Sequence, residues 1–422
     1  MFDKEKKYFP IKTATACQLK WTWSTLWLTE GSTCSCHRCE HVPLDLENFN
    51  NFHNLPHKVK EREIMLSDKW PTKKNGGSGH CEFCKKVEDK GGFSDRMYHL
   101  TIPNLSPKEL DIDPKATSVT PKILEVFMNA TCNLKCTYCN TRDSSQWRAE
   151  AEKFGTLKSI DGTEIATYRP RKNHPNTRKY FEKTLEWIEK HGHELRRLHL
   201  LGGETFYQNE LQEMIDTLKT LKNKHLELNI ISNLMVKEQT FENYIEQIRE
   251  LIVNKNIGRF DLSASIDGWG REAEYARSGL KCHHWEKLFS YAVNQKWMII
   301  NTNQTITSLT VRTIPQLLEI VKKYRKINPK IGTHFSMVTE REWMHPSVFG
   351  RKFWEDDVKN ILNVMPIDSE RDIVACKYME GTFAQIPVES DQKQIKNLKN
   401  FLDQIDKRRN TNWREVYPYL DI

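Results

Sequence analysis

No run of apolar residues in the chain approaches the roughly 20 that a membrane-spanning helix needs. The mean hydropathy is low, −0.68, and residues 1–10 are charged and lack the apolar segment of a secretory signal. Neither a long basic tract nor an internal repeat is present. These absences predict a cytoplasmic protein that has no membrane partner.

The chain of 422 residues, 38% of them hydrophobic, is long enough for two domains or for one large domain with an appendage. Its formal net charge of +8 permits an anionic partner such as nucleic acid. Lys and Arg are nevertheless mixed with Asp and Glu almost everywhere, which indicates an ordinary solvated surface. A nucleic-acid partner is therefore not favoured.

The eleven cysteines are the most informative part of the composition. In a reducing compartment they are not expected to form disulfides. Most of them are clustered: Cys17, Cys34, Cys36 and Cys39 form one group, Cys81 and Cys84 a second, and Cys132, Cys136 and Cys139 a third, whereas Cys282 and Cys376 stand alone. Clustering of this kind points to metal or iron–sulfur ligation.

From residue 121 onwards, short apolar runs alternate with longer amphipathic stretches. The runs predict strands at 123–128, 198–201, 228–232, 261–265, 298–302 and 332–337, and the stretches predict helices at 177–191, 211–223, 244–254, 285–294 and 314–324. Strands that alternate with helices indicate parallel βαβ units. Six units suggest an α/β fold with an open, partial (β/α)6 TIM-like barrel rather than a closed barrel of eight.

The third cysteine group, Cys132-Asn-Leu-Lys-Cys136-Thr-Tyr-Cys139, directly follows the first predicted strand. Three thiolates at this spacing can hold three corners of a 4Fe-4S cubane and leave the fourth iron open to a chelating group. The alternative is a zinc site, but zinc sites usually show paired Cys-x-x-Cys units. With Tyr138 before its last cysteine, the motif closely resembles the signature of the radical S-adenosylmethionine (SAM) superfamily.

The resemblance extends over residues 121–340 and implies that Cys132, Cys136 and Cys139 are the catalytic cluster ligands. It also implies SAM-binding residues at the ends of the predicted strands, and these are Tyr138, Gly202, Gly203, Glu204, Ser232, Asn233, Ser265, Asp267, Arg277 and Asn303. In the family, the two glycines let the backbone approach SAM. Thr205 stands where the family usually has Pro. His334, Glu340 and Arg341 are weaker candidates for facing the substrate.

Two interpretations of the N-terminal cysteines stay open. Cys36-x-x-Cys39 together with Cys81-x-x-Cys84 fits a four-thiolate zinc knuckle. The order of motifs between Cys17 and Arg96, which includes Trp70-Pro71 and Glu88-x-x-Gly-Gly-x-Ser-x-Arg96, instead resembles the twitch domain, a shortened SPASM-type domain of phage and bacterial radical SAM proteins. That resemblance implies an auxiliary 4Fe-4S cluster on Cys17, Cys36, Cys81 and Cys84, with Cys34 or Cys39 as a replacement for Cys36.

We therefore expect a small cluster-binding domain at 1–100, a linker at 101–121, the partial barrel at 122–345 and a helical extension at 346–422. The resemblance implies an enzyme that reductively cleaves SAM to a 5′-deoxyadenosyl radical and abstracts hydrogen from a substrate, with a peptide or protein side chain favoured. It also implies an electron donor such as flavodoxin or ferredoxin. A nucleotide or nucleic-acid modifier and a non-catalytic iron–sulfur or zinc module are the alternatives.

Overall fold

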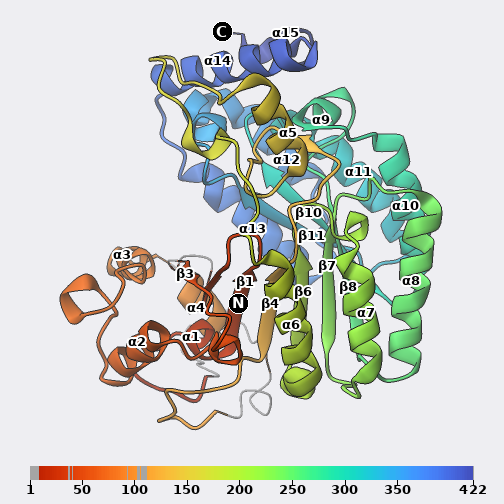
Figure 1. Ribbon diagram of the computed structural model, residues 1–422. Helices are drawn as coiled ribbons and strands as arrows, with labels where there is room; N and C mark the ends of the chain where they lie inside the picture. Colours follow the sequence, from red (N-terminus) through yellow and green to blue (C-terminus); the bar gives the residue numbers. More distant parts are fainter. Residues whose placement is uncertain are drawn as a thin grey trace.

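The computed structural model describes residues 9–36, 39, 41–92, 94–101, 105 and 112–421 (Figure 1). Among them, one nine-stranded sheet has the order β11-β10-β8-β7-β6-β4-β1-β2-β3, and a separate two-stranded sheet pairs β5 with β9. The strands are β1 (Trp23–Trp27), β2 (Ser32–Cys34), β3 (Val42–Pro43), β4 (Ile123–Phe127), β5 (Lys135–Cys136), β6 (Arg197–Leu201), β7 (Glu227–Ser232), β8 (Arg259–Ser265), β9 (Arg277–Ser278), β10 (Ile299–Ile306) and β11 (Gly332–Met337).

Fifteen α-helices are present in this part of the chain. They are α1 (Gln18–Thr22), α2 (Pro56–Leu66), α3 (Glu82–Asp89), α4 (Asp95–Thr101), α5 (Ser145–Phe154), α6 (Thr177–His191), α7 (Glu210–Thr220), α8 (Glu238–Val253), α9 (Arg271–Ala276), α10 (Cys282–Asn294), α11 (Ile314–Arg325), α12 (Glu355–Val364), α13 (Glu370–Ala384), α14 (Gln392–Arg409) and α15 (Trp413–Val416). None of the helices described is long and apolar enough to cross a membrane.

The six strands from β4 to β11 in the main sheet are all parallel to their neighbours. Helices α6, α7, α8, α10 and α11 pack on one face, where Leu124, Leu198, Leu228 and Phe260 point into the main hydrophobic core (Figure 1). No strand pairing within the described ranges joins β11 back to the other edge of the sheet. This open sheet confirms the predicted α/β class and the partial barrel.

The opposite, inner face of the sheet is polar in its middle. Thr25, Glu125, His199 and Asn229 stand in register across β1, β4, β6 and β7. Thr25 Oγ1 donates to Glu125 at 2.7 Å, and His199 Nδ1 lies 3.2 Å from the Asn229 side-chain oxygen. Alternating apolar and polar residues along each strand produce these two faces, because successive side chains point to opposite sides.

The N-terminal cysteine-rich segment shares the main sheet with the barrel. β1 runs parallel to β4 in the register Trp23↔Ile123 to Trp27↔Phe127, and β2 and β3 continue the sheet as antiparallel strands. Residues 102–104 and 106–111 of the predicted linker lie outside the described residues. The domain division stays a prediction, and the sheet itself crosses the predicted boundary.

Helices α2, α3 and α4 are not among the helices that the sequence predicted. The reason is visible in α2, which buries polar residues instead of an apolar stripe. The Arg62 side chain is completely buried and donates to the backbone oxygens of Lys20, His53 and Thr117. The Lys58 ammonium is also buried and donates to Thr33 and to the Phe52 carbonyl.

Candidate functional site

The loop that carries Cys132, Cys136 and Cys139 lies between β4 and α5, at the carboxyl end of the parallel strands. Its middle forms β5, which pairs with β9 so that Cys136 stands opposite Arg277. The Cys132 N–H donates to Ser145 Oγ at 3.0 Å, and Trp147 Nε1 donates to the Cys136 carbonyl at 2.8 Å. The three thiols are therefore presented by one loop that is fixed at several points.

The three thiols are buried or half-buried, and burial raises the pKa of each. The pKa of Cys132 rises to about 12, and the pKa values of Cys136 and Cys139 also lie above the usual value. Burial is the largest cause in each case. The neighbouring Cys136 further raises the pKa of Cys132, whereas Arg277 acts to lower the pKa of Cys136. Metal ligation at these thiols must therefore displace protons.

The end of β6 holds the start of this loop in place. The Gly203 N–H donates to the Asn129 carbonyl at 3.0 Å, and the Glu204 N–H donates to that of Thr131 at 2.9 Å. A Cβ on Gly203 would stand 2.4 Å from the Thr131 carbonyl oxygen and 2.7 Å from the Cβ of Cys132. The glycine is thus required for close approach to the cysteine loop, a contact that the sequence did not predict.

The Glu204 carboxylate connects β6 to the end of β7. It accepts from Ser232 Oγ at 2.8 Å and from the Asn233 N–H at 2.6 Å. The Asn233 amide in turn lies 3.9 Å from Cys132 Sγ. Burial raises the pKa of Glu204 to about 7, while these donors act to lower it. The structure therefore brings together Glu204, Ser232 and Asn233 beside the first cysteine.

A second group of predicted residues lies beside Cys136. The Arg277 guanidinium makes a two-point ion pair with Asp267, at 2.8 Å for each bond, and both side chains are buried. Its charge lies 5.6 Å from the centre of the Tyr138 ring. The Thr305 N–H donates a third bond to Asp267 at 2.9 Å. This carboxylate thus fixes β9, and with it the cysteine loop, to β10.

The other predicted residues lie on neighbouring strands at the same level. Ser265 stands opposite Asn303 in the register of β8 and β10, and Asn303 stands opposite His334 on β11. Ser265 is buried, Asn303 half-buried and His334 exposed. The lone cysteines are elsewhere, since Cys282 begins α10 and Cys376 lies in α13.

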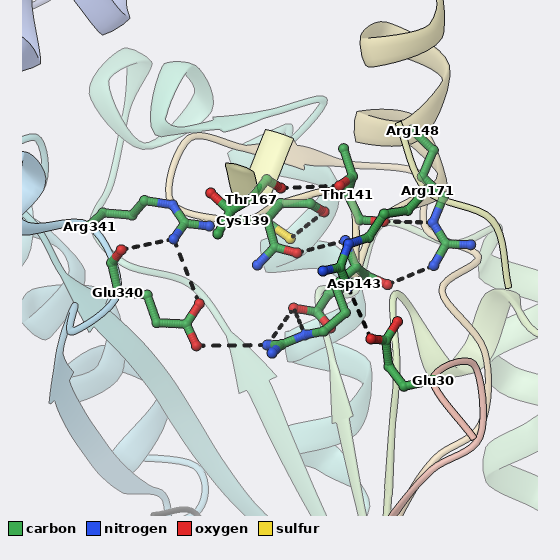
Figure 2. Close-up of polar contacts among 11 residues, drawn as sticks. Glu30, Cys139, Thr141, Asp143, Arg148, Thr167, Arg171, Glu340 and Arg341 are labelled. Atoms are coloured by element: carbon green, nitrogen blue, oxygen red, sulfur yellow. Dashed lines mark hydrogen bonds and ion pairs between the residues drawn. The ribbon is translucent and has the colours of Figure 1, made fainter. Parts of the chain in front are cut away.

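The rim beside Cys139 consists of charged residues of both signs (Figure 2). Its ion pairs are Arg142–Asp143 at 2.9 Å, Arg142–Glu340 at 3.8 Å and Arg171–Glu30 at 2.9 Å. Arg341 is buried, and its Nη1 donates to the Glu340 carbonyl at 2.8 Å. Each of these arginines has an acidic partner, so the rim combines positive and negative charges. The sequence singled out only its last two residues, Glu340 and Arg341.

The thiols of the N-terminal segment gather around the buried ammonium of Lys20. Lys20 Nζ lies 2.8 Å from Cys39 Sγ and forms an ion pair with Glu61. Cys36 Sγ lies 3.2 Å from Cys39 Sγ, and the hydrogen bond between the two sulfurs lowers the pKa of Cys39 below its usual value. The sequence did not predict Lys20, although it stands one helical turn after Cys17.

The remaining thiols differ in how near they come to this group. The hydrogen bond with Cys39 and burial raise the pKa of Cys36, and burial raises that of Cys81; the nearby Cys17 adds to both shifts. Burial likewise raises the pKa of Cys17, and the nearby Cys84 adds to that shift. Cys34 lies in β2, where its pKa is raised to about 11 by burial. Cys17, Cys36, Cys39 and Cys81 are therefore near enough for their charges to interact, and so are Cys17 and Cys84.

Glu88, Ser94 and Arg96 together hold the backbone before Cys17. Arg96 pairs with Glu88, and Ser94 Oγ donates to the same carboxylate at 2.5 Å. Arg96 Nη1 then donates to the Ala16 carbonyl at 2.8 Å. Among the described residues, no group of three or more His, Cys, Asp or Glu side chains converges closely enough to hold a single metal ion.

Residues 126–264 match the family model of the radical SAM superfamily. The chain carries a radical SAM domain. The matched segment begins in β4 and ends in β8, so it contains the cysteine loop, Gly202 to Glu204, Ser232 and Asn233. The match confirms the superfamily that the sequence motifs indicated, and with it the expectation of an enzyme.

Several solved structures are similar to this chain. SuiB of Streptococcus suis bound to the precursor peptide SuiA is 14% identical, with 93% of this chain and 72% of that chain covered and a TM-score of 0.35. SuiB bound to S-adenosylmethionine is 14% identical, with coverage of 80% and 66% and a TM-score of 0.36. TYW1 with a lysine-pyruvate adduct is 14% identical, with coverage of 56% and 70% and a TM-score of 0.31. No curated protein matches the sequence.

Proposed function

We propose that the protein cleaves SAM reductively at a 4Fe-4S cluster on Cys132, Cys136 and Cys139, and that hydrogen abstraction from a bound substrate follows. The observation that carries the proposal is the position of these three thiols. They belong to one loop at the carboxyl end of the parallel strands, which is the side of such barrels where active sites form. Buried Glu204 and Asn233 stand beside them.

The residues present fit such a cluster. One loop offers three thiols, Gly203 leaves no side chain between β6 and the loop, and the Asn233 amide faces Cys132 Sγ. When bound, the cluster supplies the electron that breaks a carbon–sulfur bond of SAM. The chain's own part is to bind and orient SAM. Glu204, with its raised pKa, and the Asp267–Arg277 pair are charged or titratable groups that are available for this purpose among the predicted residues.

We further propose an auxiliary 4Fe-4S cluster in the N-terminal segment. Its thiols gather around a buried lysine, and a cationic neighbour favours the thiolate form that binds metal. Cys17, Cys36 and Cys81 remain in the proposed ligand set. Cys39 is a stronger candidate than the sequence suggested, because it contacts both Cys36 and Lys20. Cys84 is the alternative fourth ligand.

The substrate class that we favour is a peptide or protein side chain, as the family resemblance implies. The charges of a groove beyond β11 and of the rim beside Cys139 support a peptide substrate over nucleic acid. A groove of about 860 Å³ beyond the end of β11 is lined by Glu342, Glu389 and Asp391, and no Lys or Arg of the described part of the chain lines it. A polyphosphate chain needs cationic contacts, and the arginines at the rim are paired with acids.

Anaerobic reconstitution with iron and sulfide, followed by reduction in the presence of SAM, tests the central proposal. We expect formation of 5′-deoxyadenosine, and we expect Cys136→Ala to abolish it because one corner of the cubane is lost. Cys376→Ala is the matched control, since this cysteine lies in α13 away from the loop. Unchanged 5′-deoxyadenosine formation by Cys136→Ala would refute the assignment.

The metal content tests the auxiliary site. Two 4Fe-4S clusters correspond to about eight iron atoms per chain. Cys81→Ala should lower the iron content by about half and leave SAM cleavage in place. About four iron atoms together with one zinc would instead support a zinc knuckle in the N-terminal segment.

A further inference from the structure

The last residue of α14, Arg409, reaches the loop that carries Cys136 from 274 positions further along the chain. Its Nη1 donates to the Lys135 carbonyl at 3.0 Å. Its Nε donates to the Glu150 carboxylate in α5, also at 3.0 Å. The side chains of Arg409 and Glu150 are only 5% and 3% exposed, so water does not replace these contacts.

A tryptophan extends the contact to the next residue of the loop. The Arg409 guanidinium lies 4.6 Å from the centre of the Trp147 ring. Trp147 Nε1 donates to the Cys136 carbonyl at 2.8 Å. Two successive carbonyls of β5, those of Lys135 and Cys136, are therefore bound by side chains that are stacked on each other.

Pairing with β9 also fixes β5, through the pairs Lys135↔Ser278 and Cys136↔Arg277. Glu150 completes the arrangement because it also pairs with the Lys135 ammonium at 3.0 Å. An arginine suits this place better than a lysine, since its planar group can bind a carboxylate, bind a carbonyl and stack on a ring at the same time.

The attachment of α14 to the barrel does not depend on Arg409 alone. Asn400 and Gln404 donate to the Lys158 carbonyl, and Arg408 donates to that of Gly155. Tyr275 donates to Asp406 at 2.7 Å. The helix therefore stays docked without Arg409, and the contact of Arg409 with the cysteine loop is a separate function.

We infer that Arg409 is a positioning residue for the iron–sulfur site, which fixes the backbone of Lys135 and Cys136 through its own hydrogen bond and through Trp147. The inference rests on the proposed function, because it concerns a cluster held by this loop. It makes the C-terminal extension part of the SAM-cleaving machinery, although none of its side chains is proposed as a ligand.

The test compares Arg409→Gln with Arg408→Gln, its neighbour on the same helix, in the reconstituted full-length protein. We expect Arg409→Gln to release iron to a chelator roughly tenfold faster, as loss of a hydrogen bond to a charged group would produce. We also expect a changed electron paramagnetic resonance spectrum of the reduced cluster in the presence of SAM. Arg408→Gln should match the wild type in both measurements.

The spectrum distinguishes positioning from mere stability, because general loosening of the fold lowers the melting temperature without altering the geometry of a bound cluster. Arg409→Lys should restore only part of the chelator resistance. Should Arg409→Gln fail to fold, Glu150→Gln carries the test, since it leaves the bond to the Lys135 carbonyl in place and should show a smaller change of the same kind.

Wild-type chelator resistance and an unchanged spectrum for Arg409→Gln would overturn the inference while leaving the proposed function intact. Absence of a 4Fe-4S cluster from the barrel cysteines of the wild-type protein would instead refute the proposed function. A double variant adds a further criterion. If Arg409 and Glu150 act through one contact, their combined effect must be smaller than the product of the single effects.

Discussion

Gly203 is the residue whose replacement most directly tests the contact between β6 and the cysteine loop. An added Cβ would collide with the carbonyl oxygens of Ala130 and Thr131 at 2.7 and 2.4 Å. We expect Gly203→Ala to lower the free energy of unfolding by about 1–3 kcal/mol and to reduce iron binding at the barrel site. Thermal unfolding and iron analysis measure the two effects.

Gly381 provides the matched control. It lies inside α13, and a Cβ there would meet nothing within 4 Å. Gly381→Ala should therefore stabilise the protein by roughly 0.5–1 kcal/mol, because alanine loses less conformational freedom in a helix. Equal iron contents of both variants would contradict the close approach that we assign to Gly203.

Glu204 gives the stability of the protein a defined pH dependence. Burial raises its pKa to about 7, so the folded carboxyl group keeps its proton up to a higher pH than the unfolded one. The stabilisation is complete below the unfolded pKa of about 4.3 and is lost as the pH rises towards 7, by an amount of the order of 3 kcal/mol. Glu204→Gln cannot titrate and should lose none of its stability in this way.

Denaturant unfolding at pH 5 and pH 8, without SAM, measures this difference. Relative to Glu204→Gln, the wild type should lose stability between the two pH values, and the histidines shared by both proteins cancel in the comparison. A difference between the two proteins that is the same at both pH values would show that the buried carboxylate is already charged at pH 5.

The sequence identified functional residues whose motif lies within a few consecutive positions. Cys132, Cys136 and Cys139 lie within eight positions, and Gly202 to Glu204 follow a readily recognised strand. Lys20 and Arg409 could not be found in the same way. Their importance comes from contacts with Cys39 and with the Lys135 carbonyl, which are made only after distant segments have packed together.

At the scale of elements, a buried ion pair anchors the start of α13. Arg325 donates to both oxygens of Asp372, at 2.8 and 2.9 Å, and Ser369 forms a capping box with the same carboxylate. Burial alone would raise the pKa of Asp372, but the bonds from Arg325 and Ser369 lower it below the usual value. The resulting stabilisation is present above the unfolded pKa and is lost as the pH falls through the folded one.

We therefore expect Asp372→Asn to cost about 1.5–3 kcal/mol at pH 7 and progressively less as the pH falls towards 3, as measured by denaturant unfolding. Asp356→Asn on α12 is the control, because the Asp356 side chain is 95% exposed beside Lys359 and should leave the stability unchanged. A cost of Asp372→Asn that did not vary with pH would argue against the ion pair as its source.

The predicted elements were accurate where an apolar face defines the helix or strand. The helix at 177–191 and the strand at 332–337 have the predicted bounds, and β10 extends four residues past the predicted end because its inner face is polar. Helix α2 was missed because it has no continuous apolar face. Its buried positions include Lys58, Glu61 and Arg62, which a hydrophobic pattern cannot detect.

At the scale of the whole molecule, the parallel pairing of β1 with β4 determines whether the N-terminal segment can be removed. A truncated chain that begins at Val119 would leave the edge of β4 unpaired and uncover Phe127, whose ring stacks on Trp27 at 3.5 Å. Exposed strand edges template association between chains. We expect this truncated chain to aggregate, as measured by sedimentation against the full-length protein.

A monodisperse truncated chain would instead support the separate domain that the sequence predicted for residues 1–100. Composition and periodicity describe one segment at a time, and pairing between strands 100 positions apart leaves no trace in either. The open six-strand barrel was predictable because its units repeat locally. The seventh parallel strand, contributed by the cysteine-rich segment, was not.

The shared register of β1 and β4 also sets the distance between the two cysteine sites. Cys17 and α1 precede the first residue of β1, whereas the loop with Cys132 follows the last residue of β4, and Figure 1 shows α1 and α5 at opposite ends of these strands. Five residues of strand measure about 16 Å. The two cysteine sites therefore lie at opposite ends of the strands, and an electron that passed between them would have to travel the length of the strands. Aromatic rings lie along that route. Trp27 stacks on Phe127 towards the end with Cys132, and Trp23 stacks on His199 towards the end with Cys17, with 5.4 Å between the ring centroids of the second pair.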